Sequence, residues 1–215
     1  APLLPRGRTP LRAQGRFIVD RLGERVKWAC VNWYGPESRT YTLGGLEVRP
    51  INEIIGRILD LGFNCVRVPY SLEAHIRNPV IADEFHAANS QLLGMRFLDA
   101  FDAAIEAITN AGLMVIIDNH VSRAGFCCHW SQDEGLWYVP GYPEAAWIES
   151  LVNMTARYRP NPMVVAVDLR NEVHDTHGPG GLMLTWGDGK PESDWAAAAT
   201  RAGNRVLQAN PDVLV

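Results

Sequence analysis

The stretch Met163-Val-Val-Ala-Val-Asp-Leu-Arg-Asn-Glu-Val-His-Asp175 decides the fold. Its first part, 164–169, is apolar and rich in β-branched residues, and only Asp168 interrupts it. A run of about six such residues is typical of a buried parallel strand, because a helix would need ten or more. Asn171 and Glu172 follow at once, and the carboxyl end of a parallel strand is where α/β barrels carry their chemistry. A surface loop with ordinary polar residues is the alternative for this stretch taken alone.

Apolar strands and amphipathic helices alternate along the rest of the chain. The predicted strands are 26–32, 64–69, 113–117, 164–169 and the start of one at 213–215. The predicted helices are 50–61, 95–111, 143–158 and 193–209, with a helical turn near 72–76 and a hairpin from residue 14 that continues into the first strand. This alternation predicts an α/β fold with a parallel sheet and crossover helices. An open doubly wound sheet and part of a barrel both fit, but no Gly-x-Gly-x-x-Gly follows the first strand, which argues against dinucleotide binding.

Composition narrows the class of protein. The 215 residues are 47% hydrophobic and carry a formal net charge of −4, which predicts one sizeable core. The sequence contains no Lys/Arg-rich run, so we expect neither nucleic acid nor an anionic membrane as a partner. No apolar run approaches the ~18 residues of a transmembrane helix. The composition indicates no oligomeric state.

The four cysteines are too few for a disulfide scaffold. We expect Cys30 and Cys65, on predicted strands, to be buried rather than bridged. Cys127 and Cys128 precede His129, but a metal site there would need a fourth ligand that we do not find. His174 and His177 have a suggestive spacing in a Gly-rich loop, yet a hydrogen-bonding histidine near a carboxylate is the better interpretation. We therefore predict no metal and no cofactor.

Polar side chains follow each predicted strand, and in a parallel barrel these ends share one face. Arg67 stands within an apolar strand, where a charge must be paired or costs several kcal/mol, and we expect its partner to be a carboxylate across the barrel mouth. A structural ion pair is the alternative. The candidate site residues at the strand ends are Asn32, Trp33, Arg67, His120, Asn171, Glu172 and His174.

Seven tryptophans are many for this length. Those in loops after strands could stack on the apolar faces of sugar rings or could pack the loops themselves: Trp33, Trp130, Trp137 and Trp186. We expect Trp28, Trp147 and Trp195 to pack in the core or between helices. One sequon, Asn153-Met-Thr, weakly favours secretion.

Several segments together resemble one family. They are Val31-Asn-Trp-Tyr-Gly35, Gly62-Phe-Asn-Cys-Val-Arg-Val-Pro-Tyr-Ser71, Leu136-Trp-Tyr138, Ala146-Trp-Ile148, Asp168-Leu-Arg-Asn-Glu172, Trp186-Gly-Asp188 and Ala202-Gly-Asn-Arg-Val206. With His120 after the third strand, they resemble glycoside hydrolase family 5, the cellulase-type (β/α)8 TIM barrels. This resemblance implies a secreted, extracellular endo-β-1,4-glucanase that acts on a polysaccharide or oligosaccharide with retention and without a cofactor.

The resemblance also implies roles for single residues. Glu172 would be the general acid/base, Asn171 would bind the substrate 2-hydroxyl, and Arg67 would support the nucleophile. His120 would line the subsite beside the cleavage point, and His174 would contact substrate or a neighbouring site residue. Asn32, Trp33 and Trp137 complete the expected substrate-binding set. The family usually has Pro after the Glu, and Val173 stands there in this chain.

The chain contains only about strands 1 to 5 of such a barrel, which usually takes ~250 residues. In the resembled family the nucleophile is a Glu after the seventh strand. We therefore expect residues 1–215 to be the N-terminal part of a single glycoside hydrolase catalytic domain and to be inactive alone. The alternatives are a β-mannanase or another β-glucosidase of the same family, or a non-catalytic carbohydrate-binding fragment.

Overall fold

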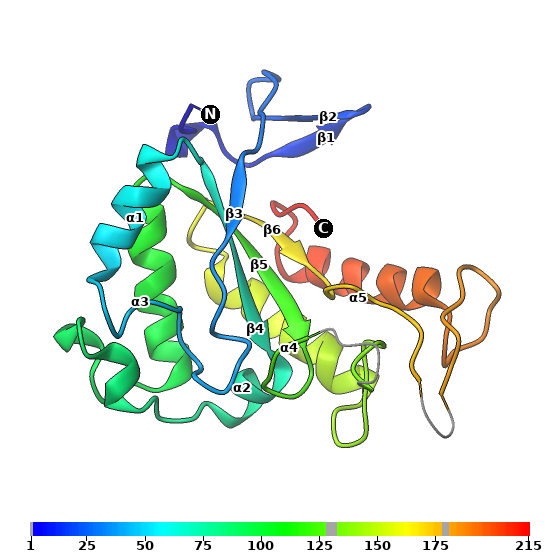
Figure 1. Ribbon diagram of the computed structural model, residues 1–215. Coiled ribbons are helices and arrows are strands. Elements are labelled where there is room, and N and C mark those ends of the chain that lie inside the picture. Colours follow the sequence, from blue (N-terminus) through cyan, green and yellow to red (C-terminus); the bar gives the residue numbers. More distant parts are fainter. Residues whose placement is uncertain (1, 128–132, 178–180) are drawn as a thin grey trace.

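A four-stranded parallel sheet forms the centre of the molecule in the computed structural model, which describes residues 2–127, 133–177 and 181–215 (Figure 1). Its strands are β3 (Cys30–Asn32), β4 (Cys65–Ser71), β5 (Met114–Val121) and β6 (Val164–Asp168), and they lie in sequence order. Every neighbouring pair is parallel. This is the start of a singly wound β/α arrangement, as predicted, with each strand beside the one before it.

The crossover helices are α1 (Ile51–Asp60), α3 (Phe97–Asn110) and α4 (Glu144–Tyr158), with the short α2 (Leu72–Arg77) directly after β4. The final helix is α5 (Trp195–Ala209). Single helical turns at Arg6–Arg8, Asp83–His86 and Ser90–Leu92 complete the helical elements. The Ser71 side chain accepts from the Ala74 N–H and caps α2, and Asp194 caps α5 in the same way through Ala197.

An N-terminal hairpin, β1 (Arg12–Gln14) and β2 (Phe17–Val19), turns at residues 15–16, whereas the hairpin was predicted to run from residue 14 and turn at 21–24. Across the predicted turn the structure has a single antiparallel bridge, Val19 with Arg25, and the hairpin does not continue into the first parallel strand. The predicted strand 26–32 begins only at Cys30. The reason is Asn64, whose side chain accepts from the Ala29 N–H and donates to the Lys27 carbonyl, so side-chain bonds replace strand pairing there. The hairpin lies near the N-terminal ends of the parallel strands (Figure 1).

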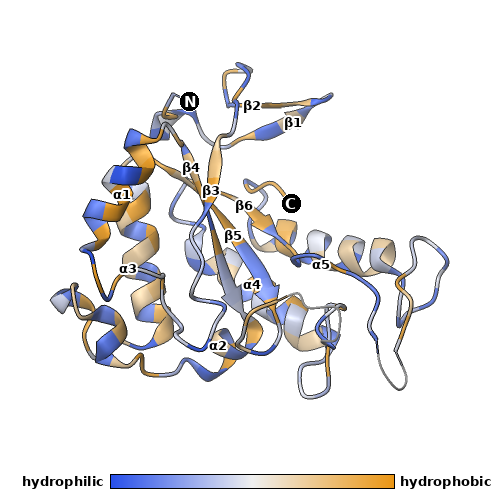
Figure 2. Ribbon diagram, viewed as in Figure 1, coloured by the Kyte–Doolittle hydropathy of each residue, from blue (hydrophilic) through white to orange (hydrophobic). Residues whose placement is uncertain are grey.

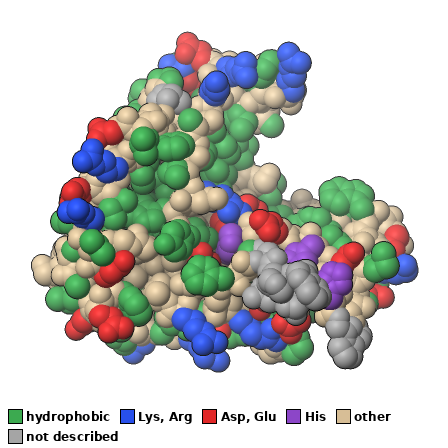
Figure 3. Space-filling model, viewed as in Figure 1, with side chains coloured by type: hydrophobic (Ala, Val, Ile, Leu, Met, Phe, Trp, Pro, Cys, Tyr) green, Lys and Arg blue, Asp and Glu red, His purple; other side chains and the backbone are tan. Residues whose placement is uncertain are grey.

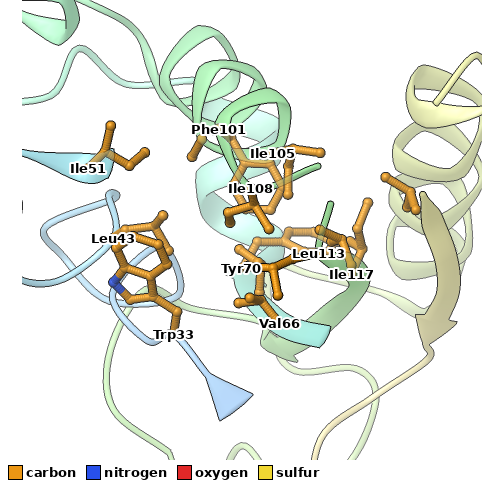
Figure 4. Close-up of a cluster of buried hydrophobic side chains, with 14 of the residues drawn as sticks. Trp33, Leu43, Ile51, Val66, Tyr70, Phe101, Ile105, Ile108, Leu113 and Ile117 are labelled. Atoms are coloured by element: carbon orange, nitrogen blue, oxygen red, sulfur yellow. The ribbon is translucent and has the colours of Figure 1, made fainter. Parts of the chain in front are cut away.

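The main core lies between the sheet and helices α1 and α3 (Figure 4). Alternate residues of β4 and β5, such as Val66 and Ile117, pack against Phe101, Ile105 and Ile108 of α3. A second cluster joins α4 and α5 to β6 through Trp147, which is fully buried. Figure 2 shows β6 as largely hydrophobic, whereas β5 becomes hydrophilic towards its carboxyl end. Burial of Trp147 and partial burial of Trp195 and Trp28 confirm their predicted packing roles.

The chain end begins to add to the sheet at β6. Leu214 forms a parallel bridge with Ala166, and its backbone exchanges hydrogen bonds of 2.9 Å with Val165 and Val167. The strand start predicted at 213–215 is therefore in place beside β6. Beyond it the inner face of the sheet borders an apolar groove that Trp28, Ile116, Ala166 and Trp186 help to line.

The two strand cysteines correct a prediction. Cys30 and Cys65 form a disulfide with Cα atoms 4.3 Å apart. They are direct register partners on β3 and β4, which brings their side chains together. Cys65 is also fully buried, so burial was predicted rightly for Cys65 and the absence of a bridge wrongly.

Candidate active site

Arg67 is the centre of a polar network at the carboxyl ends of the strands. Its Nη2 lies 2.6 Å from Asp168 Oδ2 and 3.0 Å from Asp118 Oδ1, and its Nε donates to Asp168 Oδ2 at 3.0 Å. Asp118 and Asp168 are register partners on β5 and β6. The predicted carboxylate partner thus exists, but as two aspartates of the same sheet, Asp118 on the adjacent β5 and Asp168 on β6, rather than across the barrel mouth. Arg67 therefore needs no further anion to compensate its partly buried charge.

The same guanidinium orients two amides. Nη2 of Arg67 donates to Asn171 Oδ1 at 3.0 Å, and Nη1 donates to Asn32 Oδ1 at 3.5 Å. Asn32 is the register partner of Arg67 on β3, whereas Asn171 lies just past β6. Because an arginine can only donate, the amide oxygen of Asn171 must face it and the amide nitrogen must face away. That nitrogen lies 3.2 Å from the sulfur of Cys127.

Asp118 connects Arg67 to His120. The Asp118 side chain is fully buried, and its Oδ2 lies 2.6 Å from His120 Nδ1. Burial raises the pKa of the Asp118 carboxyl, while the hydrogen bond from His120 and the charge of Arg67 act in the opposite direction. A carboxylate at Nδ1 fixes the imidazole ring so that Nε2 faces the sulfur of Cys127, 3.5 Å away. The structure thus brings Asn32, Arg67, His120 and Asn171 together, with Asp118 as the residue between them.

Glu172 occupies the turn directly after Asn171 and is exposed. Its φ is +44°, a left-handed conformation that costs roughly 1–2 kcal/mol for a residue with a side chain. Non-glycine residues are held in such conformations where the surrounding structure over-determines them, often at functional sites. Here the Asn171 N–H donates to the Asn119 carbonyl at 3.0 Å, which ties the turn to the end of β5. Val173, in place of the family's Pro, keeps a backbone N–H just after the turn.

His174 lies beside the Glu172 turn and contacts the backbone of that neighbouring site residue. Its Nδ1 hydrogen-bonds the Glu172 carbonyl oxygen, and its backbone N–H donates to Gly135 at 2.9 Å. It therefore supports the backbone of the turn.

Trp33 and Trp137 do not fit the predicted role in sugar stacking. Trp137 is fully buried and donates from Nε1 to Glu144, and Trp33 is 6% exposed and donates to the Gly44 carbonyl. Both indoles pack the protein, the alternative given for loop tryptophans. Trp186 is 77% exposed, and Trp130 lies outside the described residues.

Sequence reasoning missed a buried ion pair under the Glu172 turn. The Arg170 guanidinium has no exposed surface, and its Nη2 lies 2.9 Å from Glu134 Oε2. Burial lowers the pKa of Arg170, and the charge of Glu134 opposes that effect. The Glu134 carboxylate also accepts from the backbone N–H groups of Ser122 and Arg123. Both Arg170 and Asp118 could have been suspected from the sequence, since each places a charge next to an apolar strand.

Charged side chains gather where the molecule is hollowed. Lys/Arg, Asp/Glu and His side chains meet at the base of a notch between the hairpin and the α5 region (Figure 3). A hollow on the β5 side is lined by Arg39, Thr40, Arg123 and Phe126, and the apolar groove on the other side includes Asp168 and Trp186. An exposed carboxyl group with half-buried amide and imidazole groups beside it suits binding of a polyhydroxylated chain and proton transfer to it.

The described residues contain no group of three or more metal-binding side chains. Cys127 is disulfide-bonded, and Cys128 and His129 of the weighed metal site lie outside the described residues. Within the described part of the chain, none of the helices is both long and apolar enough to cross a bilayer.

Comparisons with known proteins agree on one family. The family model described as cellulase (glycosyl hydrolase family 5) matches residues 20–215. An endoglucanase from Paenibacillus polymyxa is 34% identical over 94% of this chain and 48% of its own length. The major extracellular endoglucanase of Xanthomonas campestris is 32% identical over 93% of this chain and 39% of its own length. The chain thus spans about half the length of the curated relatives it matches, or less.

Solved structures give the same result. The catalytic domain of the Xanthomonas campestris endoglucanase superposes with a TM-score of 0.81 at 31% identity, covering 95% of this chain and 55% of that domain. An endocellulase from Pyrococcus horikoshii in complex with cellotetraose superposes with a TM-score of 0.82 at 28% identity, again over 95% of this chain and 55% of the other. The fold is therefore that of the family's TIM-barrel catalytic domains, over about half of their length.

Proposed function

The chain belongs to glycosyl hydrolase family 5, the cellulase family, and on this premise we propose that it is part of a glycosidase that cleaves β-1,4-glucan internally with retention of configuration. Glu172 is the general acid and base of the reaction. Asn171, Arg67 and His120 position the substrate and the reacting groups. The substrate is a glucan because the relatives are endoglucanases, and one solved relative holds cellotetraose.

One observation carries this proposal: the turn Asn171-Glu172 is tied to Arg67 beside His120. The Asn171 amide is held by Arg67 on one side and its backbone by Asn119 on the other. This leaves Glu172 exposed just past the carboxyl end of β6. A general acid must first lie within hydrogen-bond reach of the atom that it protonates, and its pKa is the second requirement.

In the first step the Glu172 carboxyl donates its proton to the glycosidic oxygen as the bond to the anomeric carbon breaks. A second carboxylate attacks that carbon from the opposite face and forms a glycosyl ester, which needs the two carboxyls about 5–5.5 Å apart. Glu172, now ionised, takes a proton from water, and the resulting hydroxide equivalent cleaves the ester. Forming the ester removes the negative charge of the second carboxylate.

The carboxylates around Glu172 in the described residues are already engaged. Asp118 and Asp168 pair with Arg67, Glu134 pairs with Arg170, and Asp175 accepts from the Leu184 N–H at 2.7 Å. A nucleophile needs a free oxygen aimed at the anomeric carbon. Because these carboxylates already bond within the chain, and the chain spans about half the length of its relatives or less, we propose that the nucleophile is contributed by a further strand of a completed (β/α)8 domain, to which residues 1–215 contribute the N-terminal part.

The protein acts outside the cell. A relative carries the name major extracellular endoglucanase, and the Cys30–Cys65 disulfide is the kind of crosslink that persists in oxidising compartments.

The role of Glu172 is tested by the substitution Glu172→Gln, made in the hydrolytically active protein and assayed on two kinds of substrate. On cello-oligosaccharides, whose leaving groups need protonation, kcat should fall about 10²- to 10⁴-fold. On 2,4-dinitrophenyl cellobioside the first step should change little, because that leaving group departs as an anion. Glu149→Gln, at an exposed position on α4, is the matched control and should behave as the wild type. Equal and small losses on both substrates would contradict Glu172 as the acid.

A further inference from the structure

Gly135 stands against the backbone of the loop that carries Glu172. A Cβ added to Gly135 would lie 2.4 Å from the His174 carbonyl oxygen and 3.2 Å from that of Asp175. Carbon and oxygen atoms that are not bonded do not approach to 2.4 Å, so any larger residue would displace the segment just past Glu172. Gly125, earlier in the same long loop, has open space in the same direction. Of these two glycines, Gly135 alone makes the close approach.

The approach is made through the backbone. The His174 N–H donates to the Gly135 carbonyl at 2.9 Å, while the His174 imidazole bonds to the Glu172 carbonyl. A single residue thus connects Gly135 to the left-handed turn at Glu172. Such a turn needs neighbours that hold it, because its φ of +44° is not one that a glutamate adopts readily.

The residue before Gly135 explains why Gly135 is itself held firmly. Glu134 accepts from Ser122 N at 2.7 Å and Arg123 N at 3.0 Å, at the carboxyl end of β5. Its side chain and its carbonyl both accept from Arg170, two residues before Glu172. Glu134 and Gly135 therefore form a strap that is anchored at the ends of both β5 and β6. Glu134 contacts Arg170, which precedes Glu172, and Gly135 contacts His174, which follows it.

We propose that Gly135 is a positioning residue for the general acid: by admitting the His174 backbone at close range, it holds the Glu172 turn in its left-handed conformation. The geometry assigns this role to the long loop between β5 and α4. The inference rests on the proposed function in that Glu172 is taken as the acid. A larger side chain at position 135 moves the carboxyl away from the glycosidic oxygen without removing any group that contacts substrate.

The first test is structural and needs no activity. In this chain, hydrogen exchange of the His174 amide should speed up about tenfold or more in Gly135→Ala, because its acceptor is displaced. Gly125→Ala should leave the same amide unchanged. Unchanged protection of the His174 amide in folded Gly135→Ala would overturn the proposal.

The second test uses the hydrolytically active protein. Gly135→Ala should lower kcat on cellotetraose about 10²-fold through misplacement of the acid, with KM little changed. It should lower the rate on 2,4-dinitrophenyl cellobioside much less. Equal losses on both substrates would mean a general structural effect and would refute the positioning role.

A milder variant keeps the test decisive if Gly135→Ala does not fold. His174→Ala removes the imidazole bond to the Glu172 carbonyl and leaves the buried Glu134–Arg170 pair intact, and it should show the same preference for loss on cellotetraose. Failure of the proposed function would look different. In that case the rate loss in Glu172→Gln would not depend on the leaving group. Hydrogen exchange of the His174 amide would still test the contact with Gly135, because it does not depend on activity.

Discussion

Removal of the Arg67 guanidinium is the perturbation that the site geometry predicts most sharply. Arg67→Met keeps the aliphatic stem but leaves Asp118, a fully buried carboxylate, with His120 as its remaining ion-pair partner among the residues that the structure describes. Asp168 is 37% exposed and can be solvated, so most of the penalty arises at Asp118. Breaking a buried pair by removing one partner costs about 3–5 kcal/mol of the free energy of unfolding. For a domain of this size that corresponds to roughly 10 °C in Tm.

The penalty should depend on pH in a definite direction. Burial raises the pKa of Asp118 above its ordinary value of 3.8, and Arg67 opposes that rise. A carboxyl with a raised pKa binds more protons in the folded than in the unfolded protein, so stability falls as pH increases through that window. Without Arg67 the window extends to higher pH. The deficit of Arg67→Met relative to the wild type should therefore be greatest near pH 7 and should shrink towards pH 4.

The assay is urea unfolding at both pH values, followed by tryptophan fluorescence. Arg57→Met is the control, because Arg57 is 77% exposed and pairs with Asp60 at 3.4 Å on the surface of α1. Such a pair contributes about 0–1 kcal/mol. A loss for Arg67→Met no larger than that of the control at pH 7, or a deficit that grows on acidification, would refute the account of the Arg67–Asp118 pair.

Two further predictions concern stability. Replacing both Cys30 and Cys65 by Ala should lower the free energy of unfolding by about 3–4 kcal/mol, because the bridge closes a loop with a sequence separation of 35. Urea unfolding under non-reducing conditions measures this loss. A loss below about 1 kcal/mol would contradict the prediction. Trp147→Phe removes the 2.8 Å bond from Nε1 to the buried Leu169 carbonyl and should cost about 1–3 kcal/mol. Thermal unfolding should show the Trp147 loss, and an unchanged Tm would argue against it.

The sequence predicted the order of strands and helices well, since local patterns determine it. The helix predicted at 95–111 is α3, Phe97–Asn110, and the strand at 164–169 is β6, Val164–Asp168. The first strand was misplaced because Asn64, distant in sequence, satisfies the backbone around Lys27 and Ala29 through its side chain. No periodicity near residue 26 carries that information.

The candidate site was partly predictable for the same reason. Arg67 and Asn171 follow from the rule that parallel strand ends share one edge, and the structure joins them. Asp118 and the Cys30–Cys65 bridge depend on strand register, which the sequence does not fix. The burial of Trp137 against α4 and the close approach of Gly135 depend on how a long loop folds back over the site. Such contacts need the tertiary structure.

The central claim is that Glu172 works with a nucleophile supplied by a further part of a completed barrel. The most direct measurement is to purify residues 1–215, confirm the mass, and assay the chain on carboxymethylcellulose and cello-oligosaccharides. The account predicts no turnover above that of the Glu172→Gln variant. Robust turnover that disappears in Glu172→Gln would contradict it, because a carboxylate within these residues would then be the nucleophile.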